Sequence, residues 1–327
     1  MTTTARTRSY LGALVVASLF GGALTAALWG EKAKAAPRTD PGRILVVTIN
    51  MQEAYGADTT DMRETRVFAE KALKVAPKRP DVILLQEVKA KSAKKIRGYL
   101  SEKSGDRYVL AAPPGVEPWS QTSRTVTKKD TGILLNSETM RKADSGGYFT
   151  TRIAQGDMAK GEKAEIHKHA FVKAVEKKTG LVVPLVSVHF TLNKLFRSHN
   201  LAERYKENWV GDISEALNQK YGTDEAMVKV IGGDFNLSQC PSSIDFDVCV
   251  EDPDRFLGHH KVLYAHSYVD TFWALHERIG KAIDLIYATA DVVNSGVHSS
   301  GYTSNPSSPG FYSDHKLRWA HVASRGS

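Results

Sequence analysis

The stretch Val230-Ile-Gly-Gly-Asp-Phe-Asn236 decides the fold that this sequence predicts. The apolar, β-branched residues at its start close a run over residues 227–231 that predicts a buried strand. Two glycines follow, and Asp234 and Asn236 then stand directly behind the strand. Asp and Asn also favour ordinary turns, so the stretch gains meaning only from what the rest of the chain places beside it.

The same arrangement recurs on both sides of this stretch. Apolar runs predict further strands at residues 44–49, 82–85, 132–135, 181–188, 282–288 and 317–322. Polar or ionisable residues stand at the ends of these runs or just beyond them: Asn50, Glu87, His189, Asp284, Asp314 and His315. Strand ends that converge on one rim are where sheet enzymes build their sites, so we expect these side chains to gather.

Helices are predicted between the strands, at residues 61–75, 90–100 and 198–221. The last has Ser198 as its cap and Gly222 directly after its end. We find no internal repeat and no Pro/Gly/Ser-rich linker that would divide the chain. The pattern predicts one domain over residues 37–327, with a loop at residues 294–310.

The first residues are typical of an export signal. Arg6 and Arg8 precede an apolar run at residues 11–29, and Ala33-Lys34-Ala35 offers the small residues that a signal peptidase reads. We expect residues 1–36 to be a signal peptide, cleaved near Ala35 or Ala36, and the protein to be secreted. The alternative is an uncleaved membrane anchor, for which the run is near the lower limit of length.

The net charge of the chain and its two cysteines limit which partners and which cellular compartment we expect. The chain has 44 Lys and Arg and 36 Asp and Glu, a formal net charge of +8. Cleavage after Ala35 removes four basic residues and one acidic residue, which leaves 40 and 35 and a net charge of +5. A mildly basic protein favours a polyanion such as nucleic acid or an anionic membrane. In an oxidising compartment Cys240 and Cys249 could form a disulfide, with two free thiols as the alternative.

The residue types at the strand ends suit hydrolysis of a phosphodiester. The transition state of that reaction is highly anionic and needs a cation and hydrogen-bond donors. The oxygens of Glu87, Asn50 and Asp314 favour a hard cation such as Mg²⁺ or Mn²⁺, with Ca²⁺ as a further candidate. His189 and His315 can supply one general acid and one general base at neutral pH.

An ordered set of segments resembles the motifs of the endonuclease/exonuclease/phosphatase superfamily over essentially the whole chain after the signal peptide. The segments are Thr-Ile-Asn50-Met, Leu-Gln-Glu87-Val, Ser-Val-His189-Phe, Gly-Gly-Asp234-Phe-Asn236, Tyr-Val-Asp270-Thr-Phe, Ala-Ile-Asp284-Leu-Ile-Tyr and Ser-Asp314-His315. Asp-Phe-Asn or Ser-Asp-His alone would be weak. The complete set in this order is specific.

The resemblance implies a fold, a cofactor and a role for each residue. The fold is of the α/β (α+β) class, a four-layer αββα sandwich in which two packed mixed β-sheets are flanked by helices. Glu87 is then the chief ligand of a divalent metal, with Asn50 and Asp314 beside it. The other implied roles are a general base at His315 paired with Asp284, a general acid at His189, and positioning of the water or the phosphate oxygens by Asp234 and Asn236.

Candidates for contacts to the substrate are weaker. Tyr108 resembles, loosely, a family tyrosine near the phosphate, and Arg124 is a candidate for the arginine that contacts phosphate in deoxyribonucleases. A basic run on the predicted helix at residues 90–100 is either a solvated face or a grip on nucleic acid. Its members are Lys89, Lys91, Lys94, Lys95 and Arg97.

Two enzymatic functions and one other class follow from these observations. The first is a secreted, metal-dependent nuclease, acting as a monomer on DNA or RNA. The second is a sphingomyelinase-type phosphodiesterase, which would need an exposed apolar segment to enter a lipid surface. The candidates for that segment are Phe190, Leu192, Leu195 and Phe196. The third is a binding module without activity, which would have lost a metal ligand or the base, and none is lost in the sequence.

Overall fold

The computed structural model describes residues 42–51, 62–74, 79–224, 226–237, 257–272, 274, 283–298, 315 and 317–324. The predicted signal peptide, Asp314, and the two residues Cys240 and Cys249 lie outside these ranges. Within them the chain forms two β-sheets, which we call sheet A and sheet B, and helices on either side.

Sheet A has the strand order β14-β15-β1-β2-β6-β3. Its strands are β14 (Asp291–His298), β15 (Leu317–Ala323), β1 (Arg43–Asn50), β2 (Val82–Gln86), β6 (Gly132–Asn136) and β3 (Tyr108–Ala112). β1 pairs with β2 in parallel and with β15 antiparallel. The carboxyl ends of β1 and β2 and the beginning of β15 therefore lie at the same edge of the sheet.

Sheet B has the order β12-β13-β11-β10-β9-β5-β4, and β7 and β8 also pair with β9. The strands are β12 (Val269–Asp270), β13 (Asp284–Ala288), β11 (Val230–Asp234), β10 (Val182–His189), β9 (Ala164–Glu176), β5 (Thr125–Lys128), β4 (Trp119–Gln121), β7 (Met140–Lys142) and β8 (Gly147–Ile153). β9 has 13 residues and β10 has 8, so β9 has residues to spare beyond the ladder that the two strands share.

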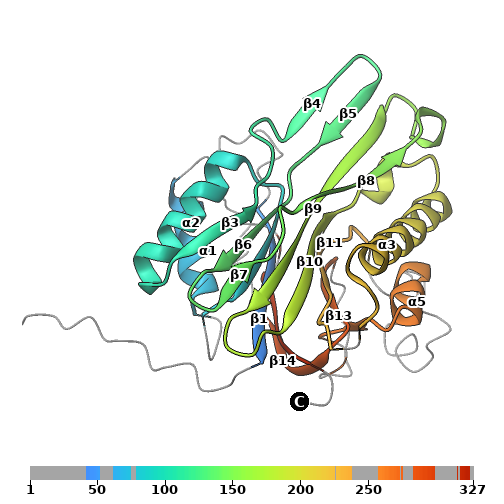
Figure 1. Cartoon of the computed structure of the whole chain (residues 1–327). Helices are drawn as coiled ribbons and strands as arrows, with labels where there is room; N and C mark the ends of the chain where they lie inside the picture. Colours follow the sequence, from blue (N-terminus) through green and yellow to red (C-terminus); the bar gives the residue numbers. More distant parts are fainter. Residues whose placement is uncertain are drawn as a thin grey trace, which may run out of the picture. The chain divides into compact units, whose positions relative to one another are not determined.

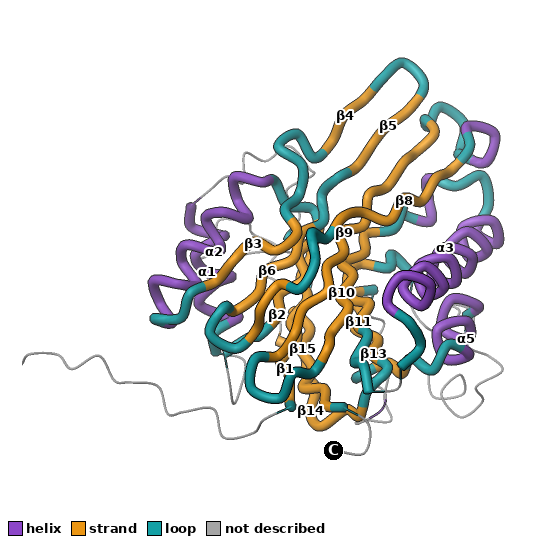
Figure 2. The backbone as a smooth tube through the Cα atoms, viewed as in Figure 1, coloured by secondary structure: helices purple, strands orange, loops and turns teal. Residues whose placement is uncertain are grey.

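The layers follow from the alternation of side chains along the strands. Alternate residues of both sheets, such as Leu84 and Leu185, form one apolar cluster between the sheets. The opposite face of sheet A packs on helices α1 (Met62–Ala72) and α2 (Ala90–Ser104). The opposite face of sheet B packs on α3 (His199–Tyr221) and α5 (Gly258–Ala265). Figures 1 and 2 show these helices on either side of the sheets, which confirms the predicted αββα sandwich.

Most of the predicted elements are present within a residue or two of their expected ends. Ser198 caps α3 by accepting a hydrogen bond from the Leu201 amide at 3.3 Å, and Gly222 follows its last turn. The predicted loop at residues 294–310 is wrong over its first part, because residues 294–298 pair with β15 as the end of β14. Among the described residues, none of the helices combines the length and the apolar character needed to cross a bilayer.

The two sheets approach closely below the edge at which β1, β2, β10 and β11 end. A Cβ atom on Gly232 would lie 2.8 Å from Leu84 Cδ1 of the other sheet, so a larger residue there would force the Leu84 side chain to move. Nearby, Gln86 Nε2 donates to Ser187 Oγ at 2.8 Å, and Ser187 Oγ donates to the Leu85 carbonyl oxygen at 2.9 Å. These buried hydrogen bonds fix one sheet against the other where the polar strand ends emerge.

Candidate active site

The strand register places the predicted residues at one rim of the two sheets. In sheet B, His189 pairs with Asp234 and Asp234 pairs with Asp284, so the three are direct neighbours on β10, β11 and β13. In sheet A, Asn50 ends β1 and Glu87 follows β2, its parallel neighbour. The structure thus brings together side chains from both sheets and from distant parts of the sequence.

Asn50 joins the two sheets at this rim. Its Nδ2 donates to Glu87 Oε1 at 2.9 Å and to Asp234 Oδ2 at 2.9 Å, although Asn50 and Asp234 are 184 residues apart. All three side chains are buried. In this geometry Asn50 orients the two carboxylates as a donor, whereas the sequence predicted that its oxygen would bind the metal.

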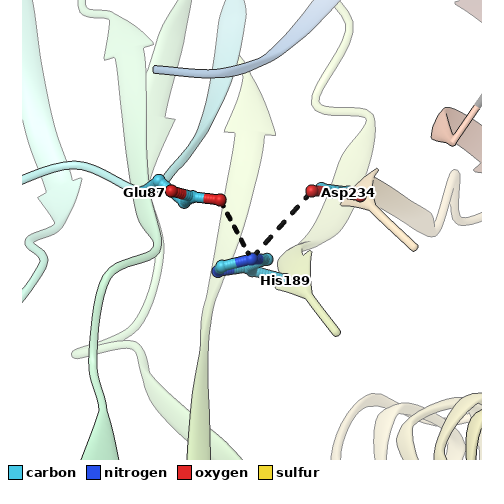
Figure 3. Close-up of side chains that lie close together, drawn as sticks. All are labelled: Glu87, His189 and Asp234. Carbon is cyan, nitrogen blue, oxygen red and sulfur yellow. Dashed lines mark ion pairs between the residues drawn. The ribbon is translucent and has the colours of Figure 1, made fainter. Parts of the chain in front are cut away.

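Glu87 points toward Asp234 and His189 from the opposite sheet (Figure 3). Its backbone has a φ of 46°, which is uncommon for a residue with a side chain. Glu87 Oε1 lies 3.4 Å from His189 Nε2. Two buried carboxylate oxygens, Glu87 Oε2 and Asp284 Oδ1, have no hydrogen-bond partner among the described residues.

These carboxylates fit a divalent cation. The ligand atoms of Glu87, His189 and Asp234 lie within 4.8 Å of one another, and so do those of Asp234, Asp284 and His315. Burial raises the pKa of Asp234, because it removes the water that would stabilise the charged carboxylate. The neighbouring Asp284 carboxylate raises this pKa further by electrostatic repulsion. Buried carboxylate oxygens that lack donors are costly, and a hard cation such as Mg²⁺ or Mn²⁺ would relieve that cost.

Asp130 is a site residue that the sequence did not reveal. Its Oδ2 accepts hydrogen bonds from His189 Nδ1 at 2.8 Å and from Trp119 Nε1 at 3.1 Å. Burial disfavours a charged imidazole, but the charge and hydrogen bond of Asp130 outweigh it, with Glu87 and Asp234 nearby, and raise the pKa of His189 to about 9. Although burial opposes it, the reciprocal interaction lowers the pKa of Asp130 to about 2. His189 is therefore held as a cation whose Nε2 faces the rim.

His315 forms the second histidine–carboxylate pair of the rim. Its Nδ1 lies 2.8 Å from Asp284 Oδ2, as the resemblance implied. Asp284 is the first residue of β13, and His315 lies just before β15. The two pairs, His189–Asp130 and His315–Asp284, stand on either side of Asp234, which belongs to both groups of ligand atoms.

The backbone after Asp234 is tightly held. Asn236 has a φ of 48°, and its backbone amide donates to Asp234 Oδ1 at 2.8 Å. Its Nδ2 donates to the Phe190 carbonyl oxygen at 2.7 Å and to Asp234 Oδ2 at 3.1 Å. Gly233, with a φ of +147°, precedes Asp234, and a Cβ there would lie 2.0 Å from the Val188 carbonyl oxygen. The Asp234 carboxylate is thus positioned by its own loop and by the end of β10.

A buried lysine supports this loop from α3. Lys206 has no exposed surface, and its Nζ donates to the Asn236 carbonyl oxygen at 2.7 Å and to Asn193 Oδ1 at 2.5 Å. Asn193 begins the 3-10 helix η2 (Asn193–Leu195), in the loop after β10. Burial lowers the pKa of Lys206 to about 7, against the opposing charges of Asp234 and Glu203. Lys206 therefore ties together the loops that follow β10 and β11.

Two further histidines hold the backbone of His189. The regular ladder between β9 and β10 ends at Ser187. Beyond it His167 Nδ1 donates to the His189 carbonyl oxygen at 2.9 Å, and His169 Nδ1 accepts from the His189 amide at 3.4 Å. Both rings are fully buried. They replace the strand hydrogen bonds that β10 loses where it diverges from β9.

Of the two residues predicted to contact the substrate, the structure places one away from the site and one on its side of the sheet. Tyr108 is buried at the beginning of β3, where its hydroxyl donates to the Pro80 carbonyl oxygen at 2.9 Å. Pro80 precedes β2, so Tyr108 lies at the opposite end of the strands from Glu87 and is not brought to the site. Arg124 is exposed in the turn between β4 and β5, on the side of the rim. Asp314 lies outside the described residues.

Comparisons with known proteins identify similar folds. No family model and no curated protein matches the sequence. An endonuclease/exonuclease/phosphatase from Bacteroides vulgatus superposes with a TM-score of 0.57 at 16% identity, over 86% of this chain and 99% of that chain. A family protein from Leptotrichia buccalis gives 0.53 at 14%, over 85% and 99%. The human Nocturnin catalytic domain, with a bound sulfate anion, gives 0.55 at 15%, over 86% and 93%.

Proposed function

We propose that this chain, which has the fold of endonuclease/exonuclease/phosphatase proteins as its motifs suggested, is a secreted, divalent-metal-dependent phosphodiesterase that hydrolyses nucleic acid. The fold by itself does not define an activity. The proposal is supported by the chemistry of the rim. The observation that carries it is the convergence of buried carboxylates with unsatisfied oxygens and two histidine–carboxylate pairs on one point.

Glu87 and Asp234 are the residues that would hold the metal, and Asp284 lies within 4.8 Å of Asp234 in the neighbouring group with His315. When bound, a divalent cation would stabilise the negative charge that develops on the phosphate oxygens. Asn50 keeps the first two carboxylates in place through its hydrogen bonds to both. Asp314, which the sequence also assigned to the metal, keeps that role as part of the proposal.

The two histidines have opposite tasks. His315, oriented by Asp284, accepts the proton of the attacking water at Nε2, because Nδ1 is occupied by the carboxylate. His189, kept protonated by Asp130, donates from Nε2 to the leaving oxygen. Since the attacking and leaving oxygens lie roughly in line across the phosphorus, a base and an acid on opposite sides of Asp234 suit the reaction.

The same geometry favours nucleic acid over a lipid surface. Of the four apolar residues that could have entered a membrane, Phe190 and Phe196 are 0% and 4% exposed. Leu192 and Leu195 are half-buried, and Leu195 packs against the cluster under α3. The turn between β4 and β5 is polar and contains Arg124. Large exposed apolar side chains in the described residues are Val116, Tyr264 and Val293.

The proposal is tested by substrate choice under one set of conditions. Purified protein is incubated with plasmid DNA, RNA and sphingomyelin vesicles at equal Mg²⁺, with and without excess EDTA. We expect cleavage of nucleic acid that EDTA abolishes and that Mg²⁺ or Mn²⁺ restores. Cleavage that survives thorough chelation would reject the metal. Lipid turnover without cleavage of nucleic acid would reject the nuclease in favour of a phospholipid phosphodiesterase.

Secretion and the disulfide are further parts of the proposal. If residues 1–36 are a signal peptide, protein recovered from the culture medium begins at Ala36 or Pro37, and N-terminal sequencing shows it. If Cys240 and Cys249 are bonded, the unfolded mature protein has no titratable thiol until a reductant is added. Protein retained in the membrane with its N-terminus intact would support an anchor instead.

A further inference from the structure

Part of sheet B continues past the catalytic rim. The ladder between β9 and β10 ends at the pair Ser187–Ala170, but residues 164–168 of β9 continue, between β5 on one side and β8 on the other. We call residues 119–128, 148–153 and 164–168 the outer ribbon. In Figures 1 and 2 the hairpin of β4 and β5 and the end of β9 extend beyond the other strands.

One face of the outer ribbon is continuous with the active site. Ala170 of β9 packs between the sheets, and Phe171 packs under α3. By alternation Lys168 shares the face of Ala170, and so does His189 on β10, since Ser187 two residues earlier bonds to sheet A. In β8, Thr150 is paired with Lys168, and Arg152 is paired with Ile166. Lys168 and Arg152 therefore follow His189 outward along one surface, which we call the inner face.

The inner face is accessible and carries basic and hydroxyl side chains around the half-buried Ile166. Thr150 and Arg152 are exposed, and Lys168 Nζ donates to Thr150 Oγ1 at 2.9 Å. Arg124 lies in the turn at the far end of the ribbon, and Lys163 Nζ fixes that turn by donating to the Thr122 carbonyl oxygen at 3.0 Å.

The one acidic residue of the outer ribbon, Glu165, lies on the opposite face and is engaged there by Lys128 and His167. Glu165 is 5% exposed and alternates with Lys168, so it lies on the side of α3. It bonds to Lys128 at 3.0 Å and to His167 at 2.7 Å. The positive charge of Lys168, Arg152 and Arg124 is therefore not balanced by a carboxylate of the ribbon.

The inner face is too long for a single phosphate. Ala164 lies four positions before Lys168 in β9, and at about 3.3 Å per residue this is roughly 13 Å. Thr125 is level with Ala164, and Arg124 lies one residue further on. At a rise of about 3.4 Å per nucleotide, this length matches some four nucleotides of one strand. A lipid headgroup or a mononucleotide would leave most of it unused.

We propose that the inner face of the outer ribbon binds the phosphate backbone of the nucleic-acid strand next to the phosphodiester that is cleaved. The proposal rests on the function inferred above, and it adds the direction in which the bound strand leaves the active site. Lys168, Arg152 and Arg124 contact successive phosphates away from the rim, and the threonine hydroxyls between them supply further donors. Contacts of this kind position the strand without reading its sequence.

Paired substrates test the proposal. Wild type, Arg152→Ala, Lys168→Met and the double variant are compared on a long DNA substrate and on bis(4-nitrophenyl) phosphate, which reaches only the rim. For the double variant we expect the ratio of kcat/KM on DNA to kcat/KM on the small ester to fall about 30-fold, mainly through KM. We also expect the slope of log(kcat/KM) on DNA against log[salt] to become shallower by about 0.7–0.9 per charge removed.

The matched control is Lys94→Ala with Arg97→Ala, on the exposed face of α2, which should behave as wild type on both substrates. Arg152→Glu serves as a second variant, since a reversed charge on an exposed side chain should enlarge the effect without unfolding the protein. The inference is overturned if the ratio and the salt slope stay at wild-type values, or if the α2 control changes them as much. If wild type hydrolyses neither substrate, the proposed function fails, and the inference fails with it.

Discussion

Replacing Asp130 with asparagine tests the assignment of His189 as the acid. Asparagine keeps the shape of the side chain and an oxygen that can accept from Trp119 and from His189 Nδ1, but it removes the negative charge. The pKa of His189 is raised from 6.5 to about 9, which corresponds to roughly 3 kcal/mol in favour of the imidazolium. Asp130 supplies the largest favourable contribution. In Asp130→Asn we expect the pKa of His189 to fall to about 6.5 or below, because burial is then less opposed.

The direction of the pH dependence follows from this shift. A raised pKa in the folded state stabilises the protein fully below pH 6.5, and the stabilisation is lost as the pH rises through about 9. Wild type should therefore lose up to about 3 kcal/mol of unfolding free energy over that interval, and Asp130→Asn should lose little. The alkaline limb of kcat/KM, where the acid loses its proton, should move to lower pH in the variant by as much as the pKa of His189 falls.

Three measurements test this prediction. NMR titration of the His189 ring in metal-free protein gives the pKa of His189, and urea unfolding at pH 6 and pH 9 gives the unfolding free energy. A pH–rate profile gives the pH at which kcat/KM falls on the alkaline side. Asp106→Asn is the control, because Asp106 pairs with Arg79 at 2.7 Å and bonds to Asn136 at the other end of the strands. A His189 pKa that stays near 9 in Asp130→Asn would refute the role of Asp130 and leave the acid unassigned.

Four further substitutions give separate outcomes. Glu87→Gln removes the charge of the chief ligand, so the Mg²⁺ concentration for half-maximal activity should rise at least tenfold; an unchanged value would place the metal elsewhere. Asp284→Asn leaves His315 without its carboxylate and should lower kcat about 10²–10⁴-fold, and a loss within tenfold would argue against the base. Lys206→Met leaves the buried Asn236 carbonyl oxygen and the half-buried Asn193 Oδ1 without this donor. It should lower the unfolding free energy in urea by about 2–4 kcal/mol and should also lower kcat; full activity would show that the two loops keep their positions without it. Gly233→Ala forces a methyl group against a carbonyl oxygen 2.0 Å away and should cost about 3 kcal/mol or more, and wild-type stability would contradict the backbone geometry.

The main strands and the rim could be predicted because two signals agree in the sequence. Apolar runs of strand length are followed or preceded by polar residues, and parallel pairing then brings the ends together. The pairing itself cannot be deduced from these runs. Tyr108 illustrates this: β3 runs in the same direction as β2, so its first residue lies at the end opposite Glu87.

The missed residues lack one of these signals. Asp130 follows β5, whose sequence Thr-Val-Thr-Lys is too polar to be recognised as a strand. It does stand two residues before the predicted strand at residues 132–135, as Asp314 stands before the last strand, and that position was a usable signal. Lys206 occupies a helical position between Ala202 and Val210 on the buried face of α3, and a lysine within an apolar stripe was the sign of a buried partner.

The hydrogen bond between Gln86 and Ser187, and the close approach of Leu84 to Gly232, have a consequence for heat resistance. Glu87 and His189 belong to different sheets, so the gap between them is set by the thickness of the apolar interior that separates those sheets. A smaller side chain at Leu84 would leave a cavity between the sheets and weaken the packing that sets this gap. Turnover should then fade at temperatures where the circular dichroism spectrum is still that of the native protein, and repacking this interior would be the direct route to a more heat-tolerant catalyst.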